Sequence, residues 1–136
     1  MKQFDFNNKN ILIVEDTITS SRFFDAALSR TNANLLWAED ADEAIKIFEE
    51  NKIDLVLLDL NLLTTSGFDV LKYIREKDKN IPIVVQTAYI LSGEEEMSFK
   101  LGANDFIAKP IKLNQLIETI GKFLGNKEEK KETTPS

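Results

Sequence analysis

Residues 54–61 read DLVLLDLN, an apolar run that is closed by Asp59. Four consecutive aliphatic residues, 55–58, leave no polar face. Continuous runs of this kind are typical of a parallel strand that is covered by helices on both sides. We therefore predict a buried central strand at residues 54–58.

Two similar runs precede this one in the sequence and two follow it. They are NILIV at 10–14, NLLWA at 34–38, IVVQ at 83–86 and DFIA at 105–108. Each gap is long enough for the helical crossover that parallel strands require. The pattern predicts an α/β fold, (βα)5, with a doubly wound parallel sheet of five strands in the common order 2-1-3-4-5.

Apolar residues between the runs recur at helical spacing. The predicted core-facing stripes are Ala41, Ala44, Ile45 and Phe48; Gly67, Val70, Leu71 and Ile74; and Leu113, Leu116, Ile117, Ile120 and Leu124. A first helix is predicted at about 18–29 and a fourth at about 93–101, where Met97 and Leu101 form an apolar pair. Asp40 with Glu43 resembles a capping box, and Gly102 is typical of a helix end.

The composition fits one globular domain and excludes several chemistries. The 136 residues are 43% hydrophobic and 29% charged, with a formal net charge of -6. Direct binding of nucleic acid is disfavoured, because it needs clustered basic residues. There is no cysteine or histidine, which excludes disulfides, Ser-His triads and imidazole metal sites. Without a membrane span or signal peptide, we expect a cytoplasmic protein.

The chain divides into three parts. Residues 1–9 form a polar N-terminal extension, and residues 10–124 contain the predicted strands and helices. Residues 125–136 lack apolar side chains and predict a disordered C-terminal tail or linker.

Polar side chains follow the predicted strands where each one ends. They are Glu15 and Asp16 after the first run, Asp59 after the third, Thr87 after the fourth and Lys109 after the fifth. The carboxyl ends of parallel strands meet at one edge of a sheet, so these residues should lie close together. Three neighbouring carboxylates repel one another unless a cation neutralises them. An all-oxygen site favours Mg2+, with Mn2+ as the alternative.

Thr87 and Lys109 add the groups that hold phosphoryl oxygens, a hydroxyl and an ammonium. Together with the carboxylate of Asp59 and a metal, they predict phosphoryl transfer to that carboxylate. Taken singly, each residue has an ordinary explanation: a helix cap, a strand residue or a solvated amine. Their joint position at one edge favours the phosphoryl site.

Five ordered motifs carry a resemblance to a known family. They are ILIVED at 11–16, LVLLDLN at 55–61, Gly67, QTA at 86–88 and GANDFIAKP at 102–110. From about residue 10 to 124 the chain resembles the CheY-like receiver domains of two-component response regulators. The resemblance implies a flavodoxin-like architecture, a signalling role rather than enzymatic turnover, and a histidine kinase or histidine phosphotransfer protein as the phosphoryl donor.

The resemblance also assigns roles to single residues. Asp59 is implied as the phosphorylated aspartate. The implied metal site consists of Asp16 as a direct ligand, Glu15 acting mostly through water or orientation, Asp59, and the backbone carbonyl of Asn61. The implied phosphoryl-binding groups are Thr87, the backbone N–H of Ala88, and Lys109. Phe106 occupies the position of the switch aromatic, Lys109-Pro110 that of a cis peptide bond, and the face of helix four, strand five and helix five that of the output surface.

One position departs from the family pattern, and several alternatives stay open. Leu63 replaces the usual proline four residues after the aspartate, which affects the loop, the lifetime of the phosphorylated state and partner contacts more than the chemistry. Tyr89 is either a gate over the acidic pocket or a surface aromatic. The rival functions are an unphosphorylated pseudo-receiver, a haloacid-dehalogenase-like phosphatase and a flavin-binding protein. The chain is either a stand-alone regulator or a receiver from a hybrid sensor kinase.

Overall fold

The computed structural model describes residues 4–62, 66–88 and 93–125 as an alternation of strands and helices. The elements are β1 (Asn10–Val14), α1 (Ile18–Leu28), a 3-10 turn (Ser29–Thr31), β2 (Asn34–Ala38), α2 (Ala41–Glu50), β3 (Leu55–Asp59), α3 (Gly67–Lys77), β4 (Ile83–Thr87), α4 (Glu94–Lys100), β5 (Asp105–Ala108) and α5 (Leu113–Leu124). All strand pairs are parallel, in the order β2-β1-β3-β4-β5. The predicted (βα)5 fold is confirmed.

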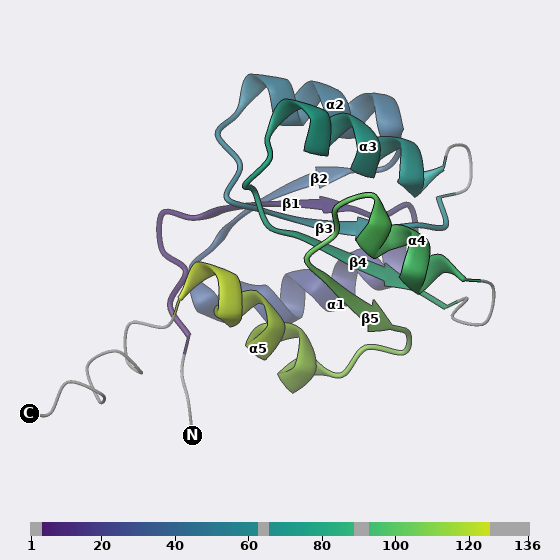
Figure 1. Cartoon of the computed structure of the whole chain (residues 1–136). Helices are drawn as coiled ribbons and strands as arrows, with labels where there is room; N and C mark the ends of the chain where they lie inside the picture. The colour runs from purple at the N-terminus through teal and green to yellow at the C-terminus, as the bar shows by residue number, and fades with distance from the viewer. Residues whose placement is uncertain (1–3, 63–65, 89–92, 126–136) are drawn as a thin grey trace, which may run out of the picture.

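The sheet lies between two layers of helices (Figure 1). Helices α2 and α3 cover one face and pack against residues such as Leu12, Leu58 and Val85. Helices α1 and α5 cover the other face and pack against Ile13, Leu57 and their neighbours. The alternation of side chains along a strand separates the two sets. Because the central strands are buried on both faces, residues 11–14, 55–58 and 83–85 are all apolar.

The N-terminal segment contributes to the core. Phe6 is only 1% exposed and packs with α1 and α5, and its N–H donates to the carbonyl of Thr31. The ring of Phe4 lies against Gly121 of α5, where an added Cβ would clash with it. Phe4 and Phe6 of the predicted N-terminal extension therefore pack against the domain, while Asn7 and Asn8 are exposed.

One residue of the apolar pair in the fourth helix and one residue that was predicted to face the core are exposed. Met97 is 45% exposed, and the buried residue of α4 is Ser98, whose hydroxyl donates to the carbonyl of Glu94. Leu113, which begins α5, is 40% exposed. A helix as short as α4 has too few turns for its apolar spacing to define a face. The predicted Asp40 cap is confirmed, because its carboxylate accepts from the N–H of Glu43 at 2.8 Å.

Arg75 of α3 ties its helix to the segment between α4 and β5. The guanidinium donates twice to the carbonyl of Gly102, at 3.0 and 2.8 Å, and once to Oδ1 of Asn104 at 2.9 Å. Gly102 directly follows the C-cap of α4 and has a φ of 110°, a conformation that favours glycine. The predicted end of α4 is confirmed at this residue.

Three features of the sequence lie outside the described residues: the loop at Leu63, the side chain of Tyr89 and the tail from residue 126. Within the described ranges, no helix combines the length and the apolar character that crossing a bilayer requires.

Candidate functional site

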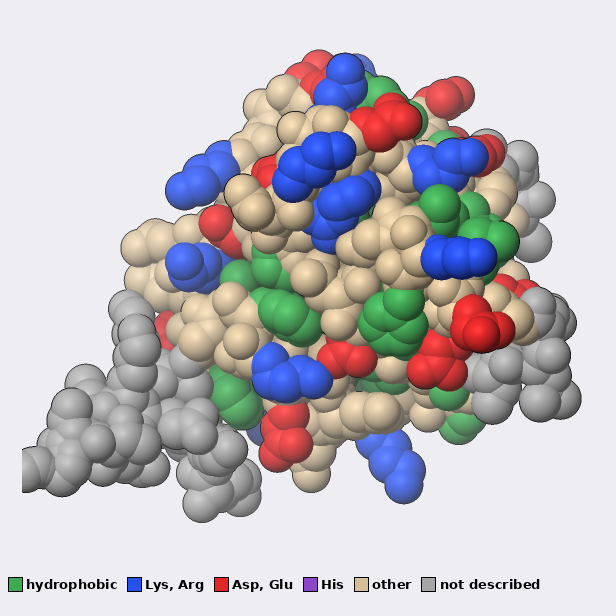
Figure 2. Space-filling model, in the orientation of Figure 1, with side chains coloured by type: hydrophobic (Ala, Val, Ile, Leu, Met, Phe, Trp, Pro, Cys, Tyr) green, Lys and Arg blue, Asp and Glu red, His purple; other side chains and the backbone are tan. Residues whose placement is uncertain are grey.

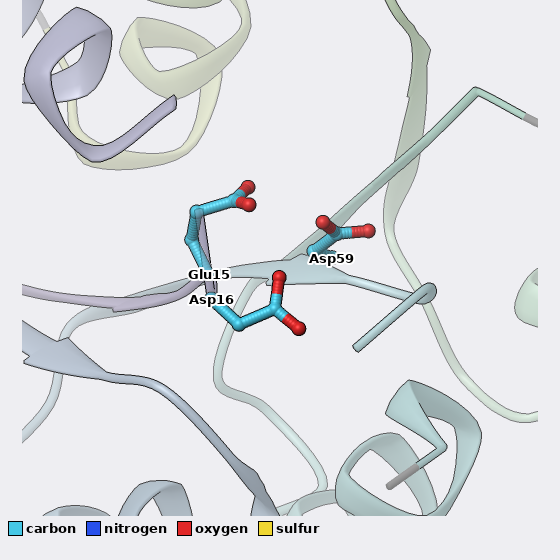
Figure 3. Close-up of side chains that lie close together, drawn as sticks. All are labelled: Glu15, Asp16 and Asp59. Carbon is cyan, nitrogen blue, oxygen red and sulfur yellow. The ribbon is translucent and has the colours of Figure 1, made fainter. Parts of the chain in front are cut away.

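The carboxyl ends of β1 and β3 bring three acidic side chains together. Val14 pairs with Leu58, so the residues that follow them, Glu15 and Asp59, are neighbours. Asp16 lies one position further along the chain. One carboxylate oxygen from each acid lies within 4.8 Å of the other two, and Figure 3 shows the carboxylates gathered around a common space. The strand order thus places the three acids as the sequence predicts.

Two of these acids are almost completely buried. Glu15 and Asp59 are each 2% exposed, while Asp16 is half-buried. Burial raises the pKa of Glu15, because a carboxylate loses hydration there, and the charge of Asp59 raises this pKa further. Hydrogen bonds from the N–H and hydroxyl of Thr17, together with the charge of Lys109, act in the opposite direction. Holding these carboxylates charged and close together costs free energy. Binding of a cation among them would lower this cost.

Lys109 supplies one positive charge to this cluster. Its Nζ lies 3.0 Å from Oδ2 of Asp59 and 3.5 Å from Oε1 of Glu15. Burial by itself lowers the pKa of this ammonium, but its hydrogen bond and ion pairs with the two carboxylates outweigh burial and raise the pKa. The lysine therefore stays charged. One ammonium beside three carboxylates still leaves an excess of negative charge.

The donor set fits a hard divalent cation. All three side chains offer oxygen, and no histidine or cysteine exists in the chain. Oε1 of Glu15 is buried and accepts no hydrogen bond from the described residues, so it keeps a lone pair available. Mg2+ typically binds one or two carboxylates and retains open positions for water and phosphate oxygens. These residues could hold such an ion.

Thr87 and Asn61 complete the edge. Thr87, the last residue of β4, has no exposed surface, and its hydroxyl donates to the side-chain oxygen of Asn61. The backbone N–H of Asn61 donates to Oδ1 of Asp59 at 2.9 Å. The sequence predicts a role only for the backbone carbonyl of Asn61. Its side chain also contacts the hydroxyl that is expected to bind phosphoryl oxygens.

Comparison with known families matches the chain to one of them. The family described as the response regulator receiver domain matches residues 11–121, which is most of the chain. The chain belongs to the response regulator receiver family. It is therefore a signalling domain of two-component systems rather than a classical enzyme, and the resemblance inferred from the motifs is confirmed.

Relatives of this receiver domain are full-length matches. The polar-differentiation response regulator DivK of Brucella anthropi is 31% identical over 120 residues, which cover 87% of this chain and 98% of DivK. The DivK of Brucella abortus is 30% identical over the same shares. The match therefore spans nearly the whole of these relatives.

Solved receiver domains have the same fold. The non-phosphorylated HemR receiver domain of Leptospira biflexa is 31% identical, with a TM-score of 0.80 over 87% of this chain and 95% of HemR. The receiver domain of sensor histidine kinase PA1611 from Pseudomonas aeruginosa is 28% identical, with a TM-score of 0.79 over 87% of this chain and 98% of its own. That structure contains a magnesium ion in its active-site cleft.

The remaining predicted residues of the receiver site lie around this edge. Ala88 follows Thr87 and is exposed, and Phe106 is half-buried against the α2–α3 side of the core. The Lys109-Pro110 peptide bond is cis, as the resemblance implies. The N–H of Lys109 donates to the carbonyl of Thr87 at 2.9 Å, which holds the two strand ends together.

Thr17 is a site residue that sequence reasoning missed. Its N–H and its hydroxyl both donate to Oε2 of Glu15, so it fixes the orientation of that carboxylate. The available signal was a threonine directly after an acidic pair and before a helix. The sequence offered Glu15 and Asp16 as caps for α1, whereas the structure places Thr17 at the N-cap position.

Proposed function

We propose that Asp59 of this receiver accepts a phosphoryl group from a phosphohistidine, with Mg2+ bound beside it. The donor is a histidine kinase or a histidine phosphotransfer protein. The observation that carries this proposal is a buried carboxylate in contact with a charged lysine and surrounded by two further acids. Family membership supports it, because receiver domains bind Mg2+ at an acidic site of this kind.

The reaction needs little covalent chemistry from the protein. An oxygen of the Asp59 carboxylate bonds to phosphorus as the bond from phosphorus to the donor's imidazole nitrogen breaks. The electron pair of that bond returns to the imidazole. Asp16, Asp59 and the carbonyl of Asn61 would hold the ion, with Glu15 acting through water or orientation. When bound, Mg2+ neutralises charge on the transferring oxygens.

Three groups at the strand ends are suited to receive the phosphoryl oxygens. Lys109 is already within 3.0 Å of Asp59 and offers a positive charge. The hydroxyl of Thr87 must leave its bond to Asn61 before it can donate to a phosphoryl oxygen. The N–H of Ala88 provides a third donor. Positioning and charge stabilisation by such groups account for most of the catalysis in phosphoryl transfer.

The movement of Thr87 supplies a route to an output. We propose that it is accompanied by reorientation of Phe106, which shifts the face formed by α4, β5 and α5 between two states. Helix α4 carries the exposed apolar side chains of Met97 and Phe99, and α5 carries that of Leu113. Figure 2 shows hydrophobic groups in separate patches that are bordered by acidic and basic side chains. A partner would therefore meet a mixed rather than a purely apolar surface.

Mass spectrometry tests the proposed reaction directly. The protein is incubated with phosphoramidate and Mg2+, and its intact mass is followed over time. We expect a gain of one phosphoryl group that depends on the metal and maps by peptide analysis to Asp59. A protein that gains no mass, or that carries the group on another residue, would refute the proposal.

Lys109→Met is expected to have opposite effects on phosphorylation and on Mg2+ binding. Loss of one charge-assisted hydrogen bond to the transferring group should slow phosphorylation by about 10- to 100-fold. Mg2+ should bind more tightly, because an ammonium that repels the cation has been removed. Phosphorylation kinetics and titration calorimetry measure the two effects.

Lys112→Met is the matched control for this prediction. Lys112 is exposed and makes no side-chain cap bond to α5, so its replacement should leave both quantities unchanged. A Lys109→Met protein that is phosphorylated at the wild-type rate would contradict the assigned role of the lysine.

A further inference from the structure

Gln86 is a buried polar residue that follows three apolar residues in β4. It is 1% exposed, follows Ile83, Val84 and Val85 in β4, and neither atom of its side-chain amide has a hydrogen-bond partner among the described residues. Burying an amide without partners costs free energy, so an apolar residue would be the more stable choice here. The position thus calls for a partner that this arrangement of the site does not provide.

The register places Gln86 beside the phosphoacceptor. Asp59 of β3 pairs with Gln86, and Gln86 pairs with Ile107 of β5. Paired residues of neighbouring strands point to the same face of a sheet. Ile107 packs on the α1–α5 side, so Gln86 and Asp59 also project to that side. Glu15 continues this row on β1, because Val14 pairs with Leu58.

Lys109 must pass over the end of β4 to reach this row. Lys109 directly follows the last residue of β5. Its Nζ nevertheless contacts Asp59 at the end of β3 and Glu15, which directly follows β1. Strand β4 lies between β3 and β5. The side chain of Lys109 therefore crosses the end of β4, where Gln86 is the penultimate residue. An ammonium has three N–H donors, of which one donates to Oδ2 of Asp59, while Oε1 of Glu15 lies 3.5 Å away as an ion-pair partner.

We infer that Gln86 is a positioning residue for Lys109, whose ammonium donates to the amide oxygen of Gln86 when it binds a phosphoryl group on Asp59. This inference rests on the proposed function. Phosphorylation moves the negative charge from the carboxylate of Asp59 to phosphoryl oxygens that lie further from the sheet. The amide then replaces a carboxylate as a neutral acceptor and keeps the ammonium directed at the phosphoryl oxygens.

The isosteric variant Gln86→Met tests this role, because it keeps the shape of the side chain and removes the amide. We expect the midpoint of thermal unfolding to rise by about 3 to 6 °C, since an unpaired buried amide is lost. The rate constant for phosphorylation by phosphoramidate at saturating Mg2+ should fall about tenfold. The Mg2+ concentration at half-saturation should not change, because Gln86 is not among the metal ligands.

A spectroscopic measurement separates positioning from packing. Beryllofluoride serves as a phosphoryl mimic, and nuclear magnetic resonance follows the lysine ammonium and the glutamine side-chain amide. In the wild type, the amide signals of Gln86 should shift when the mimic binds, and in Gln86→Met the ammonium signal of Lys109 should exchange faster with water. The wild-type measurement needs no variant to fold, and Gln86→Leu provides a second apolar replacement.

Gln115→Met is the matched control, because it makes the same chemical change at an exposed position of α5. It should have the wild-type rate constant. An unchanged rate constant in Gln86→Met, or Gln86 signals that do not respond to the mimic, would overturn the inference. A wild-type protein that neither binds the mimic nor becomes phosphorylated would instead refute the proposed function.

Discussion

An Asp59→Asn protein is expected to gain no phosphoryl group from phosphoramidate, even at saturating Mg2+. The amide oxygen of asparagine is a far weaker nucleophile than a carboxylate, although the two side chains have nearly the same shape. The variant should still fold, because asparagine has nearly the shape of aspartate and its amide oxygen can accept one of the two hydrogen bonds that Lys109 and the N–H of Asn61 now donate to separate oxygens of Asp59. Intact-mass measurement over the wild-type time course gives the result.

This substitution should also weaken Mg2+ binding, since one of three clustered acids is lost. Asp25→Asn is a suitable control, because Asp25 is an exposed acid of α1 and does not belong to the cluster of three acids. It should be phosphorylated like the wild type. A phosphoryl adduct that persists in Asp59→Asn would place the acceptor elsewhere and would remove the basis for the proposed function.

Gly67→Ala is expected to lower the free energy of unfolding by about 3 kcal/mol or more. A Cβ at this position would lie 2.5 Å from the carbonyl oxygen of Asp59 and 2.6 Å from the Cα of Leu60. Both are backbone atoms of the strand end that carries the site, so neither can move away alone. Urea denaturation measures the loss, and Mg2+ binding should weaken with it, because the strain falls directly on Asp59.

Gly121→Ala is the control, because it adds the same methyl group at a position where the Cβ meets a side chain and not backbone. The added Cβ would also clash with a neighbour there, but the neighbour is the side-chain ring of Phe4 rather than the backbone of a strand. That side chain can turn aside, and alanine favours the helix by up to about 1 kcal/mol over glycine. The loss in Gly121→Ala should therefore be much smaller. Equal losses in the two variants would contradict the argument that backbone contact makes Gly67 necessary.

The strands and the edge of the sheet that carries the site could be predicted because their signals are local. Runs such as residues 55–58 are apolar at every position, and parallel strands have only one edge where their carboxyl ends meet. This rule was sufficient to group Glu15, Asp59 and Lys109. It needs the order of the strands but no side-chain conformation.

What the sequence could not predict depends on distant contacts or on side-chain conformations. Phe6 becomes part of the core through its packing against α1 and α5. The segment around it is short and polar, so it has no hydrophobic periodicity from which this burial could be predicted. The bonds from Thr17 to Glu15 and from Thr87 to Asn61 depend on side-chain conformation. The unpaired amide of Gln86 is likewise visible only once its surroundings are known.

The contacts of Arg75 restrict how α4 can move. Its guanidinium holds the carbonyl of Gly102, directly after the C-cap of the helix, to the frame formed by α3. Helix α4 has seven residues and is about 10 Å long. A short, stiff helix that is held at its C-terminal end moves mainly by rotating about that end. Any displacement of α4 on signalling should therefore be largest at Glu94 and smallest at Lys100. The first turn of α4 is thus the part of the helix whose position should report the state of the domain most sensitively.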